Sequence, residues 1–309
     1  MSYEPRATSH EPRTGEFPDY PFKCNYLSVN GHQMHYLDEG ARNGRPLVMV
    51  HGNPTWSYFF RKPVLALRED YRCIVPDHIG MGLSAKPSPG EYGFSLTERV
   101  ADLESLMEQL DLQNPATLLL HDWGGMIGMA YACRHPDRIA SLIILNTAAF
   151  TMPAGSMLPW QLKIARGPLG PLLIQGFNVF CKSAITRCVT RDPMEPGVRQ
   201  AYLAPYDSWN NRRAVLRFVQ DIPLTPDSPS YPVLAAVEHQ LGQFIHTPML
   251  VCWGMRDFVF NAIYLEQWRK RFSGAEFHVF EDAGHYLLED AADEVIPIIE
   301  RFLKQSVKI

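Results

Sequence analysis

The sequence has no cluster of one charge sign and no long apolar run. Its formal net charge is −4, and its 29 basic and 33 acidic residues are interspersed. A nucleic-acid-binding surface needs clustered basic residues, and we find no such cluster. No segment approaches the roughly 20 consecutive apolar residues of a membrane span, and residues 1–20 lack the apolar stretch of a secretory signal. These absences predict a cytoplasmic protein that binds no nucleic acid.

Paired cysteines are also missing. The six cysteines are scattered and form no CxxC pair. Zinc sites and disulfide frameworks depend on recurring short spacings, so we interpret these thiols as buried or incidental in a reducing compartment. The sequence therefore offers no cysteine-based metal site. None of the enzymatic reactions considered below needs a metal or another cofactor.

Short apolar runs alternate with helical patterns along most of the chain. Pro46–Val50, Cys73–Pro76, Ala116–Leu120 and Ile139–Leu145 have the length and composition of buried strands. Leu96–Leu110 repeats its apolar residues at helical spacing. This alternation predicts an α/β protein with a mostly parallel central sheet flanked by helices.

The alternation stops between residues 151 and 226, where proline and glycine separate short helical pieces. These pieces are Trp160–Arg166, Leu172–Phe180, Val198–Ala204 and Asn211–Val219. Strand and helix patterns then resume and continue to the end of the chain. We interpret residues 1–150 and 227–309 as one core, residues 151–226 as an inserted helical cap, and residues 1–20 as a loosely packed arm.

Asp122 stands where an apolar strand meets a glycine-rich helix start. In the α/β-hydrolase fold a sharp turn at this point, the nucleophile elbow, holds one reactive side chain above the sheet. Serine is usual there and a glycine usually stands two residues before it, whereas this sequence has Asp122 and Leu120. A carboxylate can attack saturated carbon that carries a good leaving group, which gives an alkyl ester. The alternative is an aspartate that only caps the helix.

An earlier strand is followed by His51-Gly52-Asn53-Pro54. In this fold the oxyanion hole combines one backbone N–H from that loop with one from the residue after the nucleophile, which indicates Asn53 and Trp123. Their side-chain N–H groups are uncharged donors that could also hold a departing halide or a developing carboxylate. The alternative is that Asn-Pro only shapes a turn.

Two late loops supply candidates for a base and an acid. His285 follows the last apolar strand, where the base of this fold belongs and would activate water against an ester. Asn146 follows one strand where an acid could stand, whereas Asp257 follows the next. We therefore predict a triad of Asp122, His285 and Asp257, in which Asp257 orients the imidazole. A surface ion pair of Arg256 and Asp257 is the alternative.

Together these segments resemble the haloalkane dehalogenases. The motifs that carry the resemblance are HGNPTWSY, PDHIGMGLSAKP, HDWGGMIG, WGMRD and DAGHYLLED, and it extends from about Tyr26 to Leu303. It implies hydrolysis of a small apolar haloalkane to an alcohol and a halide ion, without a cofactor. The nucleophile, base, acid and two halide donors that it implies are Asp122, His285, Asp257, Asn53 and Trp123.

A second resemblance is closer still. NTAAF at residues 146–150 and AYLAPYDSWNNRRAVLRFVQDIPLTP at residues 201–226 are similar to the β-lactone decarboxylases of long-chain olefin synthesis. The resemblance implies the same triad, but with loss of CO2 from an alkyl β-lactone to leave a cis-alkene. Both reactions need a carboxylate nucleophile and donors that face a leaving group. Dehalogenation is our first hypothesis and β-lactone decarboxylation the alternative.

Two further hypotheses remain open at this stage. An epoxide hydrolase would need acidic donors in the cap, for which Tyr202, Tyr206 and Tyr231 are available, but the asparagine in the HGNP motif disfavours it. A non-catalytic ligand receptor on the same fold is disfavoured by the intact triad. The apolar run Gly167–Val179 could serve self-association, assembly with pathway enzymes or a membrane surface, and the sequence does not separate these.

Overall fold

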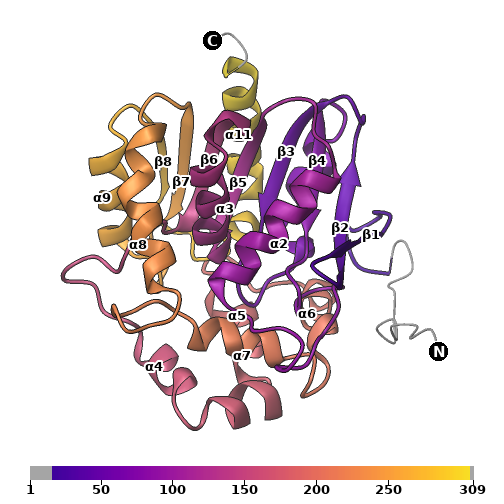
Figure 1. Cartoon of the computed structure of the whole chain (residues 1–309), viewed down its shortest axis with the longest axis vertical. Coiled ribbons are helices and arrows are strands. Elements are labelled where there is room, and N and C mark those ends of the chain that lie inside the picture. Colours follow the sequence, from indigo (N-terminus) through magenta and orange to yellow (C-terminus); the bar gives the residue numbers. More distant parts are fainter. Residues whose placement is uncertain (1–15, 307–309) are drawn as a thin grey trace.

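The computed structural model describes residues 16–306, which build an eight-stranded sheet with helices on both faces (Figure 1). The strands are β1 (Asn25–Val29), β2 (His32–Glu39), β3 (Arg45–Val50), β4 (Tyr71–Pro76), β5 (Ala116–Asp122), β6 (Ile139–Thr147), β7 (Met249–Gly254) and β8 (Glu276–Phe280). Their order is β1-β2-β4-β3-β5-β6-β7-β8. Strand β2 is antiparallel to β1 and β4, and all other neighbours are parallel. The predicted mostly parallel sheet is confirmed.

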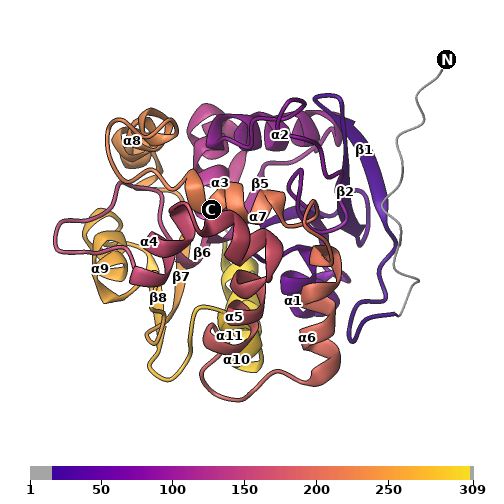
Figure 2. The same ribbon diagram turned by 90° about the horizontal axis from the view of Figure 1, so that it is seen from below.

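Helices α2, α3 and α8 cover one face of the sheet, and α1 and α11 cover the other (Figures 1 and 2). The helices are α1 (Arg61–Leu67), α2 (Leu96–Gln109), α3 (Trp123–Arg134), α4 (Trp160–Arg166), α5 (Val179–Arg187), α6 (Pro196–Leu203), α7 (Arg213–Gln220), α8 (Tyr231–Gln240), α9 (Ala262–Arg271), α10 (Leu287–Asp290) and α11 (Ala292–Gln305). Within residues 16–306, none of the helices has both the length and the apolar character needed to cross a bilayer.

Local sequence explains several element boundaries. Asn30 and Gly31 both adopt positive φ, 48° and 84°, and join β1 to β2 in the two-residue turn that the Asn-Gly pair favours. Ser95 and Glu98 form a reciprocal capping box that fixes the start of α2. Every residue of β5 is buried, as expected for a central parallel strand with helices on both faces.

Helices α4 to α7 lie together at one end of the sheet (Figures 1 and 2), and we use the name cap for residues 151–226. The predicted helix Leu172–Phe180 is wrong. A wider, π-helical segment covers Pro171–Gly176, and α5 begins only at Val179. Asn178 lies between them with φ 55°, a left-handed conformation that interrupts helical hydrogen bonding and that asparagine tolerates.

The N-terminal segment packs more closely than we predicted. Tyr20 is 3% exposed, and its hydroxyl lies 2.7 Å from Ser57 Oγ. Phe17 meets the Trp56 ring edge-on at 5.8 Å. The prediction of a loose arm is therefore wrong for the part that follows residue 15, because its aromatic side chains join the core. Residues 1–15 lie outside the described part of the chain.

Candidate active site

Asp122 occupies a strained turn between β5 and α3. Its backbone has φ 52° and ψ −125°, which is unusual for a residue other than glycine. Neighbouring glycines make this possible, because the turn packs directly on the loop after β3. A Cβ on Gly52 would stand 2.1 Å from Asp122 Oδ1, and one on Gly124 would stand 1.9 Å from the carbonyl oxygen of Val50. The elbow therefore forms even though Leu120 replaces the usual glycine.

Two backbone N–H groups converge on the Asp122 carboxylate. The N–H of Asn53 donates to Oδ1 at 2.7 Å, and the backbone N–H of Trp123 also acts to lower the pKa of this carboxyl. Burial raises the pKa of Asp122, although His285 and these donors act in the opposite direction. The two groups lie where we predicted an oxyanion hole.

His285 lies between the two predicted carboxylates. Its Nε2 is 3.6 Å from Asp122 Oδ2, and its Nδ1 is 2.7 Å from Asp257 Oδ2. Burial alone would lower the pKa of His285, but the two carboxylates outweigh it and the net direction is upward. His121 supports the loop, with its Nε2 2.9 Å from the His285 carbonyl oxygen.

Asp257 is held by three donors besides His285. The backbone N–H groups of Val259 and Phe260 donate to Oδ1 at 2.6 and 3.0 Å, and Asn146 Nδ2 donates to Oδ2 at 3.0 Å. Asp257 is only 3% exposed, so the alternative of a surface ion pair with Arg256 is wrong. Asn146, which the sequence presented only as a missing acid, anchors this carboxylate.

A cavity of about 440 Å³ opens between the cap and the triad. Asp122 and His285 line it together with mostly apolar cap side chains. Of the two predicted halide donors, only Asn53 is among the described residues of its wall, and its Nδ2 donates to the Val215 carbonyl at 3.2 Å. The Trp123 indole packs against Phe218, with ring centroids 5.1 Å apart. A long hydrocarbon group is the kind of ligand that such a wall accommodates.

The tyrosines proposed for epoxide opening have other partners. The Tyr202 hydroxyl donates to Glu289 at 2.5 Å, and the Tyr206 hydroxyl donates to the Thr55 carbonyl at 3.0 Å. Both side chains are buried, and neither lines the 440 Å³ cavity. Tyr231 belongs to α8, outside the cap. The geometry therefore gives no support to an epoxide hydrolase.

A buried ion pair of the core lies beside the site and is also contacted by the cap. Arg61 at the start of α1 donates through both terminal nitrogens to Glu289 on α10, at 2.5 and 3.0 Å. Tyr202 of α6 donates to the same carboxylate, and Arg61 lies over the Tyr58 ring at 4.1 Å. Sequence reasoning missed this cluster. Glu289 and Tyr58 stand in the DAGHYLLED and HGNPTWSY motifs, but no local pattern predicts that they meet Arg61, because the members are far apart in the chain.

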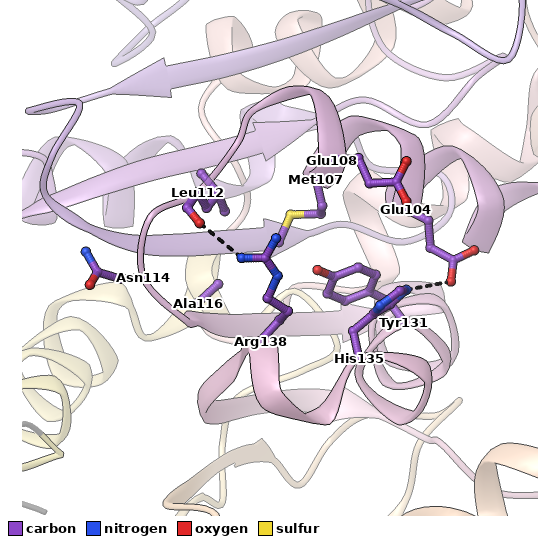
Figure 3. A pocket seen from close by; sticks show the side chains of 9 residues that line it. All are labelled: Glu104, Met107, Glu108, Leu112, Asn114, Ala116, Tyr131, His135 and Arg138. Atoms are coloured by element: carbon purple, nitrogen blue, oxygen red, sulfur yellow. Dashed lines mark hydrogen bonds and ion pairs between the residues drawn. The ribbon is translucent and has the colours of Figure 1, made fainter.

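The structure has a second hollow, of about 120 Å³, whose lining residues are drawn in Figure 3. Its lining residues are Glu104, Met107, Glu108, Leu112, Asn114, Ala116, Tyr131, His135 and Arg138. Ala116 begins β5, whereas Asp122 ends it, so the two sites lie at opposite ends of that strand. Glu104 pairs with His135 at 3.0 Å, and Arg138 donates to the Leu112 carbonyl at 3.3 Å. Because Asp122 and His285 line the cavity beneath the cap and not this hollow, we place the candidate active site in the cap cavity.

Comparisons with known proteins agree with the observed fold. Residues 45–292 match the family model described as the alpha/beta hydrolase fold. The chain is 49% identical to a cis-3-alkyl-4-alkyloxetan-2-one decarboxylase of Shewanella oneidensis, over 93% of this chain and 90% of that protein. It is 43% identical to a decarboxylase of the same name from Xanthomonas campestris, over 94% and 99% of the two chains.

Dehalogenases are more distant relatives. A haloalkane dehalogenase of Mycolicibacterium paratuberculosis is 32% identical over 90% of this chain and 91% of its own length. The crystal structure of the haloalkane dehalogenase DatA from Agrobacterium tumefaciens superposes with a TM-score of 0.81 at 24% identity, and covers 92% of this chain and 97% of that one. The structural similarity supports the fold alone.

Proposed function

This chain belongs to the α/β-hydrolase family, as do the decarboxylases and dehalogenases that it matches, and we propose that it decarboxylates cis-3,4-dialkyl β-lactones. The observation that carries the proposal is the higher identity to decarboxylases, 49 and 43%, than to the dehalogenase, 32%. This order favours our alternative hypothesis over our first one.

In the proposed first step, Asp122 attacks C4 of the lactone. Its carboxylate oxygen forms a bond to C4 as the bond from C4 to the ring oxygen breaks. The electron pair of the broken bond stays on the ring oxygen, which becomes part of a carboxylate attached to C3. Attack from the side opposite the ring oxygen inverts C4. Two features support this role, namely the position of Asp122 in the cavity wall and the Asn53 N–H that orients its carboxylate.

In the second step, the bond between C3 and the new carboxylate breaks and releases CO2. Its electron pair forms the double bond between C3 and C4, and the bond from C4 to Asp122 breaks, which regenerates the aspartate. Anti elimination after inversion leaves the two chains cis in the alkene. Atoms and charge balance without water, metal or redox cofactor.

We assign His285 a different role from that of a hydrolytic base. No proton has to be removed in the two steps, so a protonated imidazole can stabilise both the leaving carboxylate and the Asp122 carboxylate that returns. The raised pKa of His285 favours this charged form, and Asp257 2.7 Å away supports it. Dehalogenation would instead need neutral His285 to activate water.

Haloalkane cleavage is the second candidate, as a side activity of the same nucleophile. Asn53 reaches the cavity wall, where one N–H of its amide donates to the Val215 carbonyl, but the Trp123 indole packs on Phe218 and is not among the described residues of the wall. A halide would therefore receive less stabilisation than the two donors together could give.

The test compares the two reactions side by side. Purified protein is incubated with a cis-dialkyl β-lactone and with bromo- and iodoalkanes, and alkene and halide are measured together. An Asp122→Asn variant serves as the blank. We expect alkene from the lactone, weak halide release, and neither product above background with Asp122→Asn. Fast halide release with inert lactone would contradict the proposal, and equal activity of the variant would contradict Asp122 as nucleophile.

We also propose a cytoplasmic location, supported by six cysteines that are all free thiols. Assembly with other enzymes stays a prediction. The run Gly167–Val179 includes Leu169, Leu172 and Phe177, each more than half exposed, and such a surface is typical of an interface.

A further inference from the structure

A second apolar pocket adjoins the active-site cavity. We call the 440 Å³ space the main cavity, and a neighbouring space of about 80 Å³ the side pocket. We propose that a substrate with two alkyl chains places one chain in the main cavity and the other in the side pocket. This inference rests on the proposed function, and it adds where each chain lies.

Three side chains belong to both walls and form the partition. They are Leu162 on α4, Ile222 after α7 and Val259 after β7. Two of them come from the cap and one from the core, so the partition stands where the cap meets the triad. Aliphatic side chains occupy discrete staggered rotamers, so the inference requires these three side chains to change rotamer and let an alkyl chain pass between the two spaces.

The side pocket begins beside the reacting groups. Val259, in the partition, donates its N–H to Asp257, and Phe260 in the pocket wall stacks on the His285 ring at 5.9 Å and 23°. Ala148, also in the wall, follows Thr147, whose hydroxyl donates to the carbonyl of Asp122. A lactone carbon held at Asp122 therefore lies in the main cavity, with the side pocket across the partition.

The chemistry of the side pocket is that of a hydrocarbon site. Among the described residues that line it, every side chain is apolar except for the hydroxyl of Tyr264. An alkyl chain buried there gains transfer free energy without leaving a polar group unpaired. Because the side pocket is several times smaller than the main cavity, we expect the two spaces to accept alkyl chains of different size.

Two buried alanines allow a matched test. Ala148 lines the side pocket and Ala184 lines the main cavity, with exposures of 4% and 7%. Ala148→Leu and Ala184→Leu therefore make the same chemical change in the two spaces. The substrates are two regioisomers, cis-3-octyl-4-methyl and cis-3-methyl-4-octyl β-lactone, and kcat/KM for alkene formation is measured for each.

We expect the two variants to shift the ratio of kcat/KM between the regioisomers in opposite directions, each by about tenfold or more, as filling a chain pocket by a few methylenes does. Leu224→Ala, which enlarges the side pocket at a half-buried position, should shift the ratio opposite to Ala148→Leu. Equal loss on both regioisomers with Ala148→Leu, together with no shift by Leu224→Ala, would overturn the inference.

A binding measurement separates this inference from the proposed function. Unreactive cis-3,4-dialkyl β-lactams with the same two chain patterns are titrated calorimetrically into Asp122→Asn protein with and without Ala148→Leu. We expect Kd to rise about tenfold or more for one lactam and less than about twofold for the other. If lactones give no alkene but this discrimination appears, the function fails and the two-chain site stands. If alkene forms and Kd rises equally for both lactams, the two-chain site fails.

Discussion

The buried pair of Arg61 and Glu289, which Tyr202 of the cap also contacts, allows the sharpest stability prediction, for Glu289→Gln. The Arg61 and Glu289 side chains are only 1% and 6% exposed, so loss of the carboxylate would leave the guanidinium charge buried. Removing one partner of a buried pair costs about 3–5 kcal/mol, because the other charge stays buried and unpaired. Glutamine keeps one acceptor oxygen, so we expect about 3 kcal/mol.

This loss is measured by urea unfolding followed by tryptophan fluorescence. At about 2 °C per kcal/mol for a chain of this size, the thermal midpoint should fall by about 6 °C. The control is the Arg61→Leu/Glu289→Leu double variant, in which neither charge remains buried. We expect it to be less destabilised than the sum of its two single variants.

The effect also depends on pH. Burial raises the pKa of Glu289, but Arg61 outweighs it and the net direction is downward. Because the pKa of Glu289 is lower in the folded state, its carboxylate stabilises the protein fully at a pH above its unfolded-state pKa of about 4.3. This stabilisation is lost as pH falls toward the folded-state pKa. The gap between wild type and Glu289→Gln should therefore narrow below about pH 4.3. A gap under about 0.5 kcal/mol at pH 7, the size of an ordinary surface change, would refute the reasoning.

Two further predictions concern the triad. The carboxylates raise the pKa of His285 against the effect of burial. Alkene formation should therefore fall as pH rises through a midpoint above the ordinary histidine pKa of about 6.5, whereas halide release should rise. Measuring kcat/KM for both reactions between pH 5 and 10 checks this, and an alkene rate that rises with pH would contradict the role assigned to His285. Gly52→Ala should displace the nucleophile and destabilise the fold by about 1–3 kcal/mol, because its Cβ would stand 2.1 Å from Asp122 Oδ1. Mass spectrometry of Asp122 alkylation by an iodoalkane measures the displacement, with Gly242→Ala as the control because a Cβ there meets nothing within 4 Å. Equal alkylation of the two variants would count against the packing argument.

Most of the core could be predicted because its signals are local. Continuous apolar runs predicted the central strands, and the Asn30-Gly31 pair is an equally local signal for the turn between β1 and β2. The cap helix at Leu172–Phe180 was misplaced because a left-handed Asn178 leaves no clear mark in an apolar stretch. The packing of Tyr20 was missed because its partner Ser57 is 37 residues away.

The candidate site was predictable to the extent that each residue follows a recognisable strand. Asp122, His285 and Asp257 all do, and the structure brings them together. The second role of Asn146 was not predictable, because its amide contacts Asp257 and Gly254 across the fold. The position of the Trp123 indole depends on Phe218 of the cap, which no pattern near Trp123 reveals.

The strained turn at Asp122 also has an entropic consequence. The carboxylate of a free aspartate samples several rotamers, and ordering it at the moment of attack would lower the rate. Here the close approach of Gly52 and the Asn53 N–H at 2.7 Å confine the carboxylate before any substrate arrives. The conformational entropy of the nucleophile is thus lost when the chain folds rather than in each catalytic cycle. When a flexible two-chain substrate binds, the conformational entropy that remains to be lost is that of the substrate.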